Sequence, residues 1–377
     1  MKVIKKEFKS ALNKYKFPDS WFWARYSTNP YSGCQHACIY CDARSERYYL
    51  NDFENEVVVK IDNDKKIDNK IKRARKMLPD VVGPGGVSDA YQPIEREVEN
   101  TKKTLLILKK HKFPVNVATK SKLILRDISI LSDIANDTWC TVGFSITTID
   151  EEVARFLEPH SSTPLERLNA MKKIKEIAPK IQIGTYFMPI IPFLEDGDDN
   201  LEEIVSKSKE VGADFVLFSP GLTLRDSQKS FFLKKLKNSK YKGILDSLLD
   251  LYGEKPHPTR VYARSINKKM LQICKKYKIQ IRIKRWIPED YRKWNYKTSQ
   301  LLLDKYYIDS LLGPPDKSFL WAGLYLNNMD ESIVAVRERG QLSRLKGFNP
   351  RITDIVERFL KNKNAQRTSN LDYFLKK

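Results

Sequence analysis

The feature that most constrains this chain is an alternation between short apolar runs and longer periodic segments. Segments with apolar residues at three- and four-residue spacing, as at 97–111 and 164–178, predict helices. Short apolar runs that end in polar or turn residues predict buried strands between the helices. Parallel strands joined by helices follow, so the predicted fold class is α/β. The predicted strands are 57–60, 115–119, 141–147, 181–188 and 215–219.

Length and cysteine content narrow the class of protein further. A chain of 377 residues can form one large domain or two ordinary ones. Its sequence has no apolar run of about 18 residues, and its start, MKVIKKEFKS, lacks the apolar stretch of a secretory signal, so we expect a cytoplasmic protein without membrane contact. Five cysteines, three of them within eight positions, do not suit a disulfide framework and predict reduced thiols.

The positive charge is concentrated in the later part of the chain. Residues 1–220 carry 34 Lys and Arg against 32 Asp and Glu, whereas residues 221–377 carry 34 against 15. A field of this sign attracts polyanions. Together with a change in strand spacing, the charge predicts a basic lead-in at 1–24, a core at 25–221 and a basic C-terminal region at 222–377.

The densest basic stretch, residues 255–300, has 14 basic side chains against two acidic ones. Aromatic residues alternate with its cations, a combination suited to phosphate contacts and base stacking. Nucleic acid is therefore the predicted partner of the C-terminal region, and the alternative is a lysine-rich composition with the aromatics in a core. The run IQIRIKRW also alternates strictly at 279–283, which predicts one strand. The aromatics are Tyr262, Tyr277, Trp286, Tyr291, Trp294 and Tyr296.

The strongest chemical signal is the segment NPYSGCQHACIYCDAR at 29–44. Cys34, Cys38 and Cys41 are separated by three and then two residues, so three thiolates on one short loop can each bind one iron of a [4Fe-4S] cluster. The fourth iron is then open to an outside ligand. A zinc site that adds His36 to the cysteines is the alternative, although a histidine two residues from cysteines on both sides is cramped for tetrahedral closure.

This spacing, with the aromatic Tyr40 before Cys41, resembles the radical S-adenosylmethionine (SAM) superfamily. The resemblance covers residues 25–220 through SDAYQPIE, ATKS, GFSITT, RFLEP and ERL, in the order typical of the branch related to spore photoproduct lyase. It implies a partial (β/α)6 TIM-like barrel of radical SAM type with a basic C-terminal extension. It also implies a [4Fe-4S] cluster and SAM as cofactors, reductive cleavage of SAM to a hydrogen-abstracting radical, and an electron donor such as flavodoxin or ferredoxin.

The resemblance, carried over by residue, places the SAM pocket at the ends of barrel strands. Ser88 and Asp89 fall at the end of the second barrel strand, where that family contacts SAM. Lys120 matches a lysine expected to meet the cofactor carboxylate, for which an ammonium is a point-charge partner. Ser145 matches a strand-end hydroxyl at the same pocket. The implied SAM contacts are Tyr40, Ser88, Asp89, Lys120, Ser145 and Arg167.

Several of these positions also have a structural explanation. Lys120 is alternatively a surface lysine, and Ser145 a strand-end residue that bonds backbone groups. Arg167 pairs either with the SAM carboxylate or with Glu158. Tyr186 is a candidate for the barrel interior, and its alternative is an ordinary core aromatic. The cysteines at positions 140 and 274 are predicted core residues.

Two departures from the lyase pattern separate this chain from the lyase itself. The lyases have a cysteine three residues before the aspartate of the Ser-Asp pair, which returns hydrogen to the product radical, and Gly86 stands at that place here. Asp42 stands where the lyases have a tyrosine. No catalytic residue is therefore assigned.

Three hypotheses for the function follow from these patterns. The first is a radical SAM enzyme that repairs or modifies nucleic acid. The second is a radical SAM enzyme with a protein or small-molecule substrate, whose basic region docks an acidic partner. The third is a zinc-stabilised nucleic-acid-binding protein without catalysis.

Overall fold

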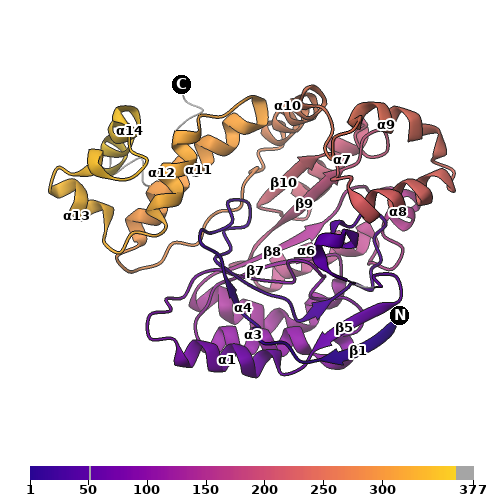
Figure 1. The fold of residues 1–377 in the computed structure, drawn as a ribbon, viewed down its shortest axis with the longest axis horizontal. Helices are drawn as coiled ribbons and strands as arrows, with labels where there is room; N and C mark the ends of the chain where they lie inside the picture. Colours follow the sequence, from indigo (N-terminus) through magenta and orange to yellow (C-terminus); the bar gives the residue numbers. More distant parts are fainter. Residues whose placement is uncertain (51, 362–377) are drawn as a thin grey trace. The chain divides into compact units, whose positions relative to one another are not determined.

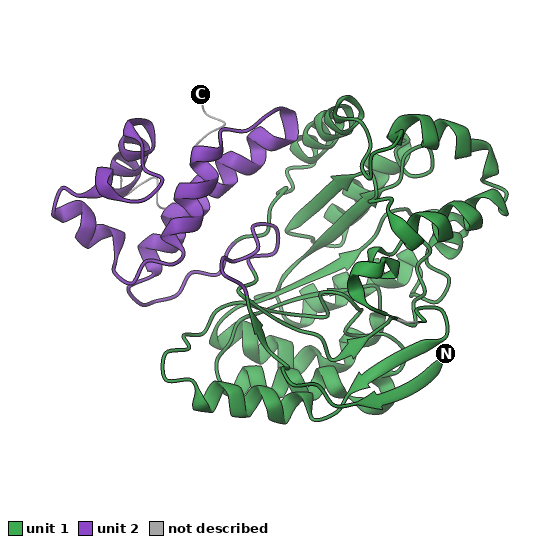
Figure 2. Cartoon of the chain, viewed as in Figure 1, with its two compact units in different colours: residues 1–14, 24–284 green, residues 15–23, 285–377 purple. Residues whose placement is uncertain are grey.

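The computed structural model describes residues 1–50 and 52–361. The chain forms two compact units (Figure 2). Unit 1 comprises Met1–Lys14 and Ala24–Lys284, and unit 2 comprises Tyr15–Trp23 and the chain from Arg285 onward. The functional division predicted between residues 221 and 222 stays a prediction.

Unit 1 is built on an open sheet with six parallel strands (Figure 1). The hydrogen-bonded order is β10-β9-β8-β7-β6-β3, and β2 (Asn13–Lys14) pairs antiparallel with β3 at the edge. The six strands follow one another across the sheet in chain order, as in a partial (β/α)6 barrel, and the predicted fold class is confirmed. Their bounds are β3 (Tyr26–Thr28), β6 (Val82–Pro84), β7 (Val115–Thr119), β8 (Cys140–Ser145), β9 (Gln182–Ile190) and β10 (Phe215–Pro220).

Helices connect the strands and cover the outside of the sheet. Helices α4, α6 and α7 pack against β8 and β9, and α10 packs against β10. The segment 97–111, predicted as one helix, spans the end of α2 and all of α3, because Glu99 adopts the left-handed conformation at φ 53° between them. The bounds are α1 (Asn63–Arg73), α2 (Glu95–Val98), α3 (Asn100–Lys110), α4 (Ile128–Asp137), α5 (Glu151–Leu157), α6 (Pro164–Ile177), α7 (Asp198–Glu210), α8 (Asp226–Lys237), α9 (Leu245–Tyr252) and α10 (Arg260–Lys276).

A second, three-stranded sheet positions the cysteine segment. Strand β1 (Lys2–Lys6) runs parallel to β5 (Glu56–Lys60), and β4 (Tyr31–Ser32) pairs antiparallel with β5. The strand predicted at 57–60 therefore exists but lies outside the barrel sheet. Because β4 ends just before the cysteines, its pairing with β5 fixes where their loop begins.

The prediction of a strand at 279–283 is wrong. This segment makes a single bridge to β10, between Gln280 and Phe215. Its isoleucines are buried as the alternation predicted, but Arg282 between them is buried too. The alternation therefore reflects the burial of the isoleucines and not a hydrogen-bonded strand, and of the residues between them Gln280 is exposed.

The interior of the barrel is filled by Tyr186 of β9. Its neighbour Thr185 bonds Ser208 of α7 on the outer face, so Tyr186 points to the opposite, inner face. The Tyr186 side chain is 2% exposed and donates to Asn116 Oδ1 at 2.9 Å. A Cβ placed on Gly143 of β8 would lie 2.1 Å from the Tyr186 ring. Tyr186 is thus a packed core aromatic within the barrel, and Gly143 makes the room for it.

Unit 2 is a helical assembly with its own core. Arg285 is buried between the rings of Trp23 and Tyr296, at 4.8 and 4.0 Å from their centroids, and donates to Ser299 Oγ at 3.1 Å. This contact joins Tyr15–Trp23 to the C-terminal helices. Tyr296 is therefore a core residue, so the base-stacking role predicted for it is wrong. The helices are α11 (Lys293–Leu312), α12 (Lys317–Leu326), α13 (Ile333–Glu338) and α14 (Pro350–Lys361).

Short 3-10 helices complete the described secondary structure. Two of them, η1 (Asp42–Arg44) and η2 (Glu46–Tyr48), directly follow the cysteines. The others are η3 (Lys122–Asp127), η4 (Lys242–Ile244) and η5 (Leu342–Arg344). No helix within residues 1–50 and 52–361 has both the length and the apolar composition that crossing a membrane requires.

We expect Gly143→Ala to lower the free energy of unfolding by about 1–3 kcal/mol, because its methyl group meets the buried Tyr186 ring. The midpoint of urea unfolding measures the loss. Gly197→Ala is the matched control, since nothing lies within 4 Å of a Cβ there, and we expect a change within about 0.5 kcal/mol. Equal midpoints for the two variants would contradict this packing of the barrel interior.

Candidate active site

The three cysteines lie on the loop between β4 and η1. Gly33 precedes them with φ 79°, and a Cβ at this position would lie 2.8 Å from the carbonyl oxygen of Glu56. Only glycine allows the chain to turn here against β5. Cys34 and Cys38 are buried and Cys41 is partly buried, and none of the three forms a disulfide.

Gln92 anchors the first half of this loop. Its Oε1 accepts from the backbone N–H of Gln35 at 2.9 Å, and its Nε2 donates to the carbonyl of Gly33 at 3.2 Å. Further along, the backbone N–H of Ile39 donates to the carbonyl of Leu157 at 2.9 Å. The loop is therefore held to the ends of two different barrel units. Sequence reasoning did not single out Gln92, although it lies within the SDAYQPIE motif.

Arg44 anchors the second half of the loop. Its Nε donates to the carbonyl of Cys38 at 2.8 Å and its Nη2 to the carbonyl of Ala37 at 3.0 Å. The guanidinium also lies 4.4 Å from the centroid of Phe53 and 3.9 Å from that of Phe231. A planar cation with several donors suits this position because it satisfies two carbonyls and packs against two rings. Sequence reasoning missed Arg44, although it ends the cysteine segment.

His36 is engaged by protein groups other than the cysteines. Its Nε2 lies 3.3 Å from Asp89 Oδ2, and its Nδ1 is 3.1 Å from the carbonyl of His160. In the described part of the chain, no three His, Cys, Asp or Glu side chains converge as ligands of one metal ion would. Both ring nitrogens of His36 lie beside Asp89 and His160, so the structure gives His36 partners other than a zinc ion.

Asp89 is the acceptor for a group of donors at the ends of β6 and β7. Its two oxygens accept from Tyr91 N–H at 2.8 Å, Thr119 Oγ1 at 2.8 Å and Lys120 N–H at 2.7 Å. Burial by itself raises the pKa of Asp89, but the facing His36 and these hydrogen bonds lower it to about 2. Asp89 thereby holds the backbone of Lys120 and, through His36, the cysteine loop. Its predicted SAM contact stays a prediction.

Glu158 brings together three of the predicted site residues. Its carboxylate accepts a hydrogen bond from the Tyr40 hydroxyl, pairs with Arg167 Nη2 at 2.5 Å, and lies 3.8 Å from Lys120 Nζ. Of the two partners weighed for Arg167, the structure shows Glu158. The Arg167 guanidinium also donates to the carbonyl of Ser145 at 2.7 Å, which ties the end of β8 to the same group.

Charges in this group reinforce one another. Burial disfavours the charged form of Glu158, but Arg167 and Lys120 overcome it and lower the pKa of the carboxyl. Burial likewise opposes the charge of Lys120, yet Glu158 raises its pKa above the ordinary value. Lys120 is therefore an ammonium at neutral pH, as the predicted contact with a SAM carboxylate requires. Its Nζ lies 5.7 Å from the centroid of the Tyr40 ring.

The two predicted serines differ in their surroundings. Ser88 is buried, and its hydroxyl donates to the carbonyl of Tyr31 at 3.2 Å, which leaves it able to accept. Ser145 is half-buried at the end of β8. Both lie at the carboxyl ends of strands, where the ligand sites of parallel α/β barrels are built. Their SAM contacts stay predictions.

Glu195 is a buried carboxyl that sequence reasoning did not identify. It lies in the loop after β9, is 0% exposed, and accepts from the backbone N–H of Ile191 at 2.9 Å. Burial raises its pKa well above the ordinary value, although hydrogen bonds from Thr147 and Ile191 oppose the shift. Glu195 joins the loops after β8 and β9 through these hydrogen bonds. No sequence pattern marked it, because an acidic residue in a loop is usually exposed.

Burial also sets the state of the cysteine thiols. It raises the pKa of Cys34 to about 12 and the pKa values of Cys38 and Cys41 above the usual range. The free thiols are neutral, so iron binding displaces their protons. The three side chains share one loop, and the sequence has no other group of three cysteines. These residues suit a [4Fe-4S] cluster whose remaining iron binds SAM.

Cys140 and Cys274 lie away from this loop. Cys140 begins β8 and is 0% exposed, and Cys274 on α10 is 1% exposed. Burial raises the pKa of Cys140 above the ordinary range and that of Cys274 to about 12. Both are core residues, as predicted.

The structure is an open parallel barrel that carries a three-cysteine loop at the carboxyl ends of its strands. These features place the chain in a class of cofactor-dependent α/β proteins. The model of the radical SAM superfamily matches residues 28–207. This chain belongs to the radical SAM superfamily, and its cofactors are a [4Fe-4S] cluster and SAM.

Relatives and solved structures agree with this family. An uncharacterized protein of Methanocaldococcus jannaschii is 31% identical over 211 residues, 55% of this chain and 74% of the relative. An uncharacterized protein of Mycobacterium tuberculosis is 27% identical over 276 residues, 72% of this chain and 79% of the relative. Spore photoproduct lyase complexed with dinucleoside spore photoproduct has the same fold, with a TM-score of 0.56 at 15% identity over 73% of this chain and 79% of the lyase.

We expect Glu158→Gln to lower the free energy of unfolding by about 3 kcal/mol, because it leaves buried cations without their counter-charge. Thermal or urea unfolding measures the change. Glu166→Gln is the matched control: it removes a charge from the more exposed pair with Lys122, keeps a residue suited to the capping box, and should cost less than about 1 kcal/mol. Equal losses would show that Glu158 does not organise the site.

Proposed function

We propose that this chain is a radical SAM enzyme that acts on nucleic acid, repairing or modifying a base. Bound cluster and SAM supply a 5'-deoxyadenosyl radical that abstracts hydrogen from the substrate. Cys34, Cys38 and Cys41 hold the cluster in this proposal. The chain's remaining task is to orient SAM and to exclude water from the barrel mouth.

The site residues divide into contacts and positioning groups in this proposal. Lys120 provides the cation for the SAM carboxylate, and the hydroxyls of Ser88 and Ser145 allow close approach with a hydrogen bond to spare. Tyr40 closes one side of the pocket with its ring. Glu158 is a positioning residue, since it fixes both Tyr40 and Lys120.

The observation that favours nucleic acid is a stripe of cations on α10. Arg260, Arg264, Lys268 and Lys275 are exposed at four- and seven-residue spacing, which places them along one side of the helix. Within the described residues, none of the four forms an ion pair. Unpaired cations at regular intervals suit a phosphate backbone.

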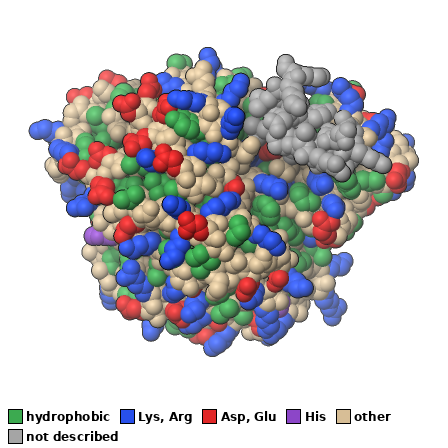
Figure 3. Space-filling model, turned by 180° about the vertical axis from the view of Figure 1, so that it is seen from behind, with side chains coloured by type: hydrophobic (Ala, Val, Ile, Leu, Met, Phe, Trp, Pro, Cys, Tyr) green, Lys and Arg blue, Asp and Glu red, His purple; other side chains and the backbone are tan. Residues whose placement is uncertain are grey.

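The charge around this stripe supports the proposal. Residues 221–284, which form α8 to α10 in unit 1, carry 17 Lys and Arg against 4 Asp and Glu. On the face shown in Figure 3, basic side chains are spread over the surface with acidic ones among them. The solved lyase of the same fold is described as complexed with a dinucleoside photoproduct, which is a nucleic-acid ligand.

Most of the aromatic side chains predicted for base stacking have protein partners. The hydroxyls of Tyr262 and Tyr277 donate to Asp196 at 2.9 Å and to Glu202 at 2.7 Å. Tyr291 is 42% exposed and is available to a base. The cations on α10, more than the aromatic side chains, therefore support the nucleic-acid proposal.

The chemistry is tested by anaerobic reconstitution with iron and sulfide, reduction with dithionite, and chromatography for 5'-deoxyadenosine. We expect the wild type to be coloured and to form the product, and the Cys34→Ala, Cys38→Ala, Cys41→Ala variant to do neither. Cys274→Ala is the control and should keep both properties. A colourless, zinc-loaded wild type that forms no product would contradict the proposed chemistry and favour a zinc-stabilised binding protein.

The substrate class is tested by the salt dependence of oligonucleotide binding. Replacing Arg260, Arg264, Lys268 and Lys275 with Gln removes up to four phosphate contacts, so the slope of log K against log salt concentration should fall by about 3 to 4. Replacing Lys172, Lys173 and Lys180, which are exposed elsewhere on unit 1, should leave the slope unchanged. Weak wild-type binding without salt dependence would favour a protein or small-molecule substrate.

A further inference from the structure

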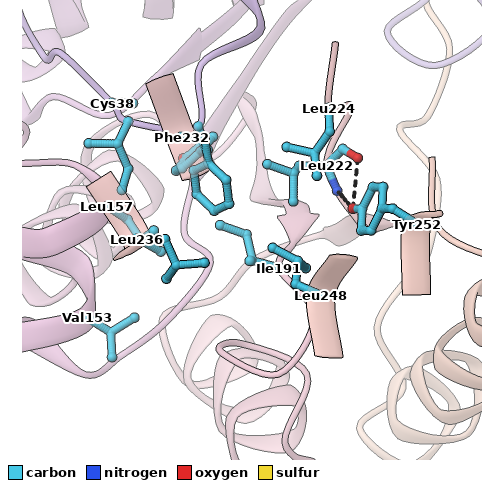
Figure 4. Close-up of a cluster of buried hydrophobic side chains, with 12 residues drawn as sticks. Cys38, Val153, Leu157, Ile191, Leu222, Leu224, Phe232, Leu236, Leu248 and Tyr252 are labelled. Carbon is cyan, nitrogen blue, oxygen red and sulfur yellow. Dashed lines mark hydrogen bonds between the residues drawn. The ribbon is translucent and has the colours of Figure 1, made fainter. Parts of the chain in front are cut away.

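Helix α8 covers the cysteine loop with its inner face. Phe232 and Leu236 pack with Cys38 in one cluster of buried side chains, against which Cys41 also packs (Figure 4). The Gln228 side chain donates to the carbonyl of Tyr40 at 3.1 Å. This helix is therefore a wall of the cluster site and not a remote surface element.

The start of α8 is also bound to the segment that follows the cysteines. Ser227 Oγ donates to the carbonyl of Arg44 at 3.0 Å, and Ser45 Oγ donates to Asp226 Oδ2 at 2.7 Å. The Lys235 ammonium lies 5.2 Å from the Phe231 ring, and Arg44 stacks on that same ring at 3.9 Å. A short series of contacts thus links the outer face of α8 to the loop.

The outer face of α8 is basic and unpaired. Lys234, Lys235 and Lys237 are exposed, and across residues 1–50 and 52–361 none of them forms an ion pair. The helix has one acidic residue, Asp226, which lies at its opposite end. Lysines in a last helical turn also stabilise the helix, but that effect does not require three exposed charges directly behind a cofactor loop.

We propose that this face of α8 is the docking surface for an acidic one-electron carrier protein, such as a flavodoxin. The inference rests on the proposed function, which requires one electron for each SAM cleaved. The reduced carrier gives that electron to the cluster and is itself oxidised. No bond forms or breaks and no proton moves in this step. Electron transfer falls steeply with distance, so the donor has to dock close to the loop. The α8 lysines lie on the outer side of the helix that packs on the loop, and they attract an acidic partner.

The α8 face and the α10 stripe suit different partners. The α8 lysines form a compact group in one helical turn behind the cysteine loop, whereas the α10 cations extend along a whole helix that packs on β10. A compact patch suits a small globular carrier, and an extended stripe suits a phosphate backbone. The assignment of α8 to the carrier follows from its contacts with the cysteine loop.

The test compares the reconstituted wild type with a Lys234→Gln, Lys235→Gln, Lys237→Gln variant. The control replaces Lys172, Lys173 and Lys180 with Gln, which are exposed near α6. Affinity for flavodoxin is measured at low and high salt, and 5'-deoxyadenosine formation is measured with reduced flavodoxin and, separately, with dithionite. Thermal unfolding verifies that each variant is folded.

We expect the α8 variant to bind flavodoxin at least about 10-fold more weakly at low salt and to lose the flavodoxin-driven rate in proportion. Its dithionite-driven rate should remain that of the wild type, because a small reductant needs no docking surface. The control should match the wild type in every measurement.

Several results would overturn the docking proposal. Equal affinity of the wild type and the α8 variant for flavodoxin would do so. A wild-type affinity for flavodoxin that is the same at low and high salt would do so too. Loss of oligonucleotide binding in the α8 variant, with flavodoxin binding retained, would assign the face to nucleic acid. Failure of the wild type to cleave SAM with dithionite would instead refute the proposed function, because no carrier takes part in that reaction.

Discussion

The site depends on one buried carboxylate, that of Glu158. Removing a charge from water costs several kcal/mol unless partners compensate it. Glu158 obtains its partners from three separate parts of the chain, since Tyr40, Lys120 and Arg167 all reach it. Each of these groups is therefore fixed by the others, and the cysteine loop and the ends of β7 and β8 cannot shift independently.

The cysteine loop has little regular structure and is instead held by side chains. Gln92 bonds its first half, Arg44 its second half, and Gln228 of α8 the carbonyl of Tyr40. Such side-chain hydrogen bonds satisfy carbonyls of the loop that have no partner in a helix or a sheet. A preorganised loop presents three thiols at fixed positions, which reduces the ordering that cluster binding would otherwise require.

The basic character of the chain has a more specific location than its total charge suggests. Residues 221–284 hold most of the excess and belong to the same compact unit as the cysteine loop. In unit 2, by contrast, many cations are paired, as in Arg337 with Glu357 and Arg339 with Glu331. The field that attracts anions is thus centred on the unit that carries the chemistry.

The sequence by itself determined the parallel α/β class, the cysteine loop and the strand ends that form the site, because periodicity and spacing are local properties. It also placed Cys140 and Cys274 in the core. Only the tertiary structure decided which strands pair, that 279–283 makes a single bridge, and that Arg44, Gln92 and Glu195 support the site. These roles depend on contacts between residues far apart in the chain, and such contacts leave no periodic or compositional pattern. Burial and neighbouring charges shift the pKa values of Lys120 and Glu195 for the same reason, since a pKa depends on groups that folding alone brings together.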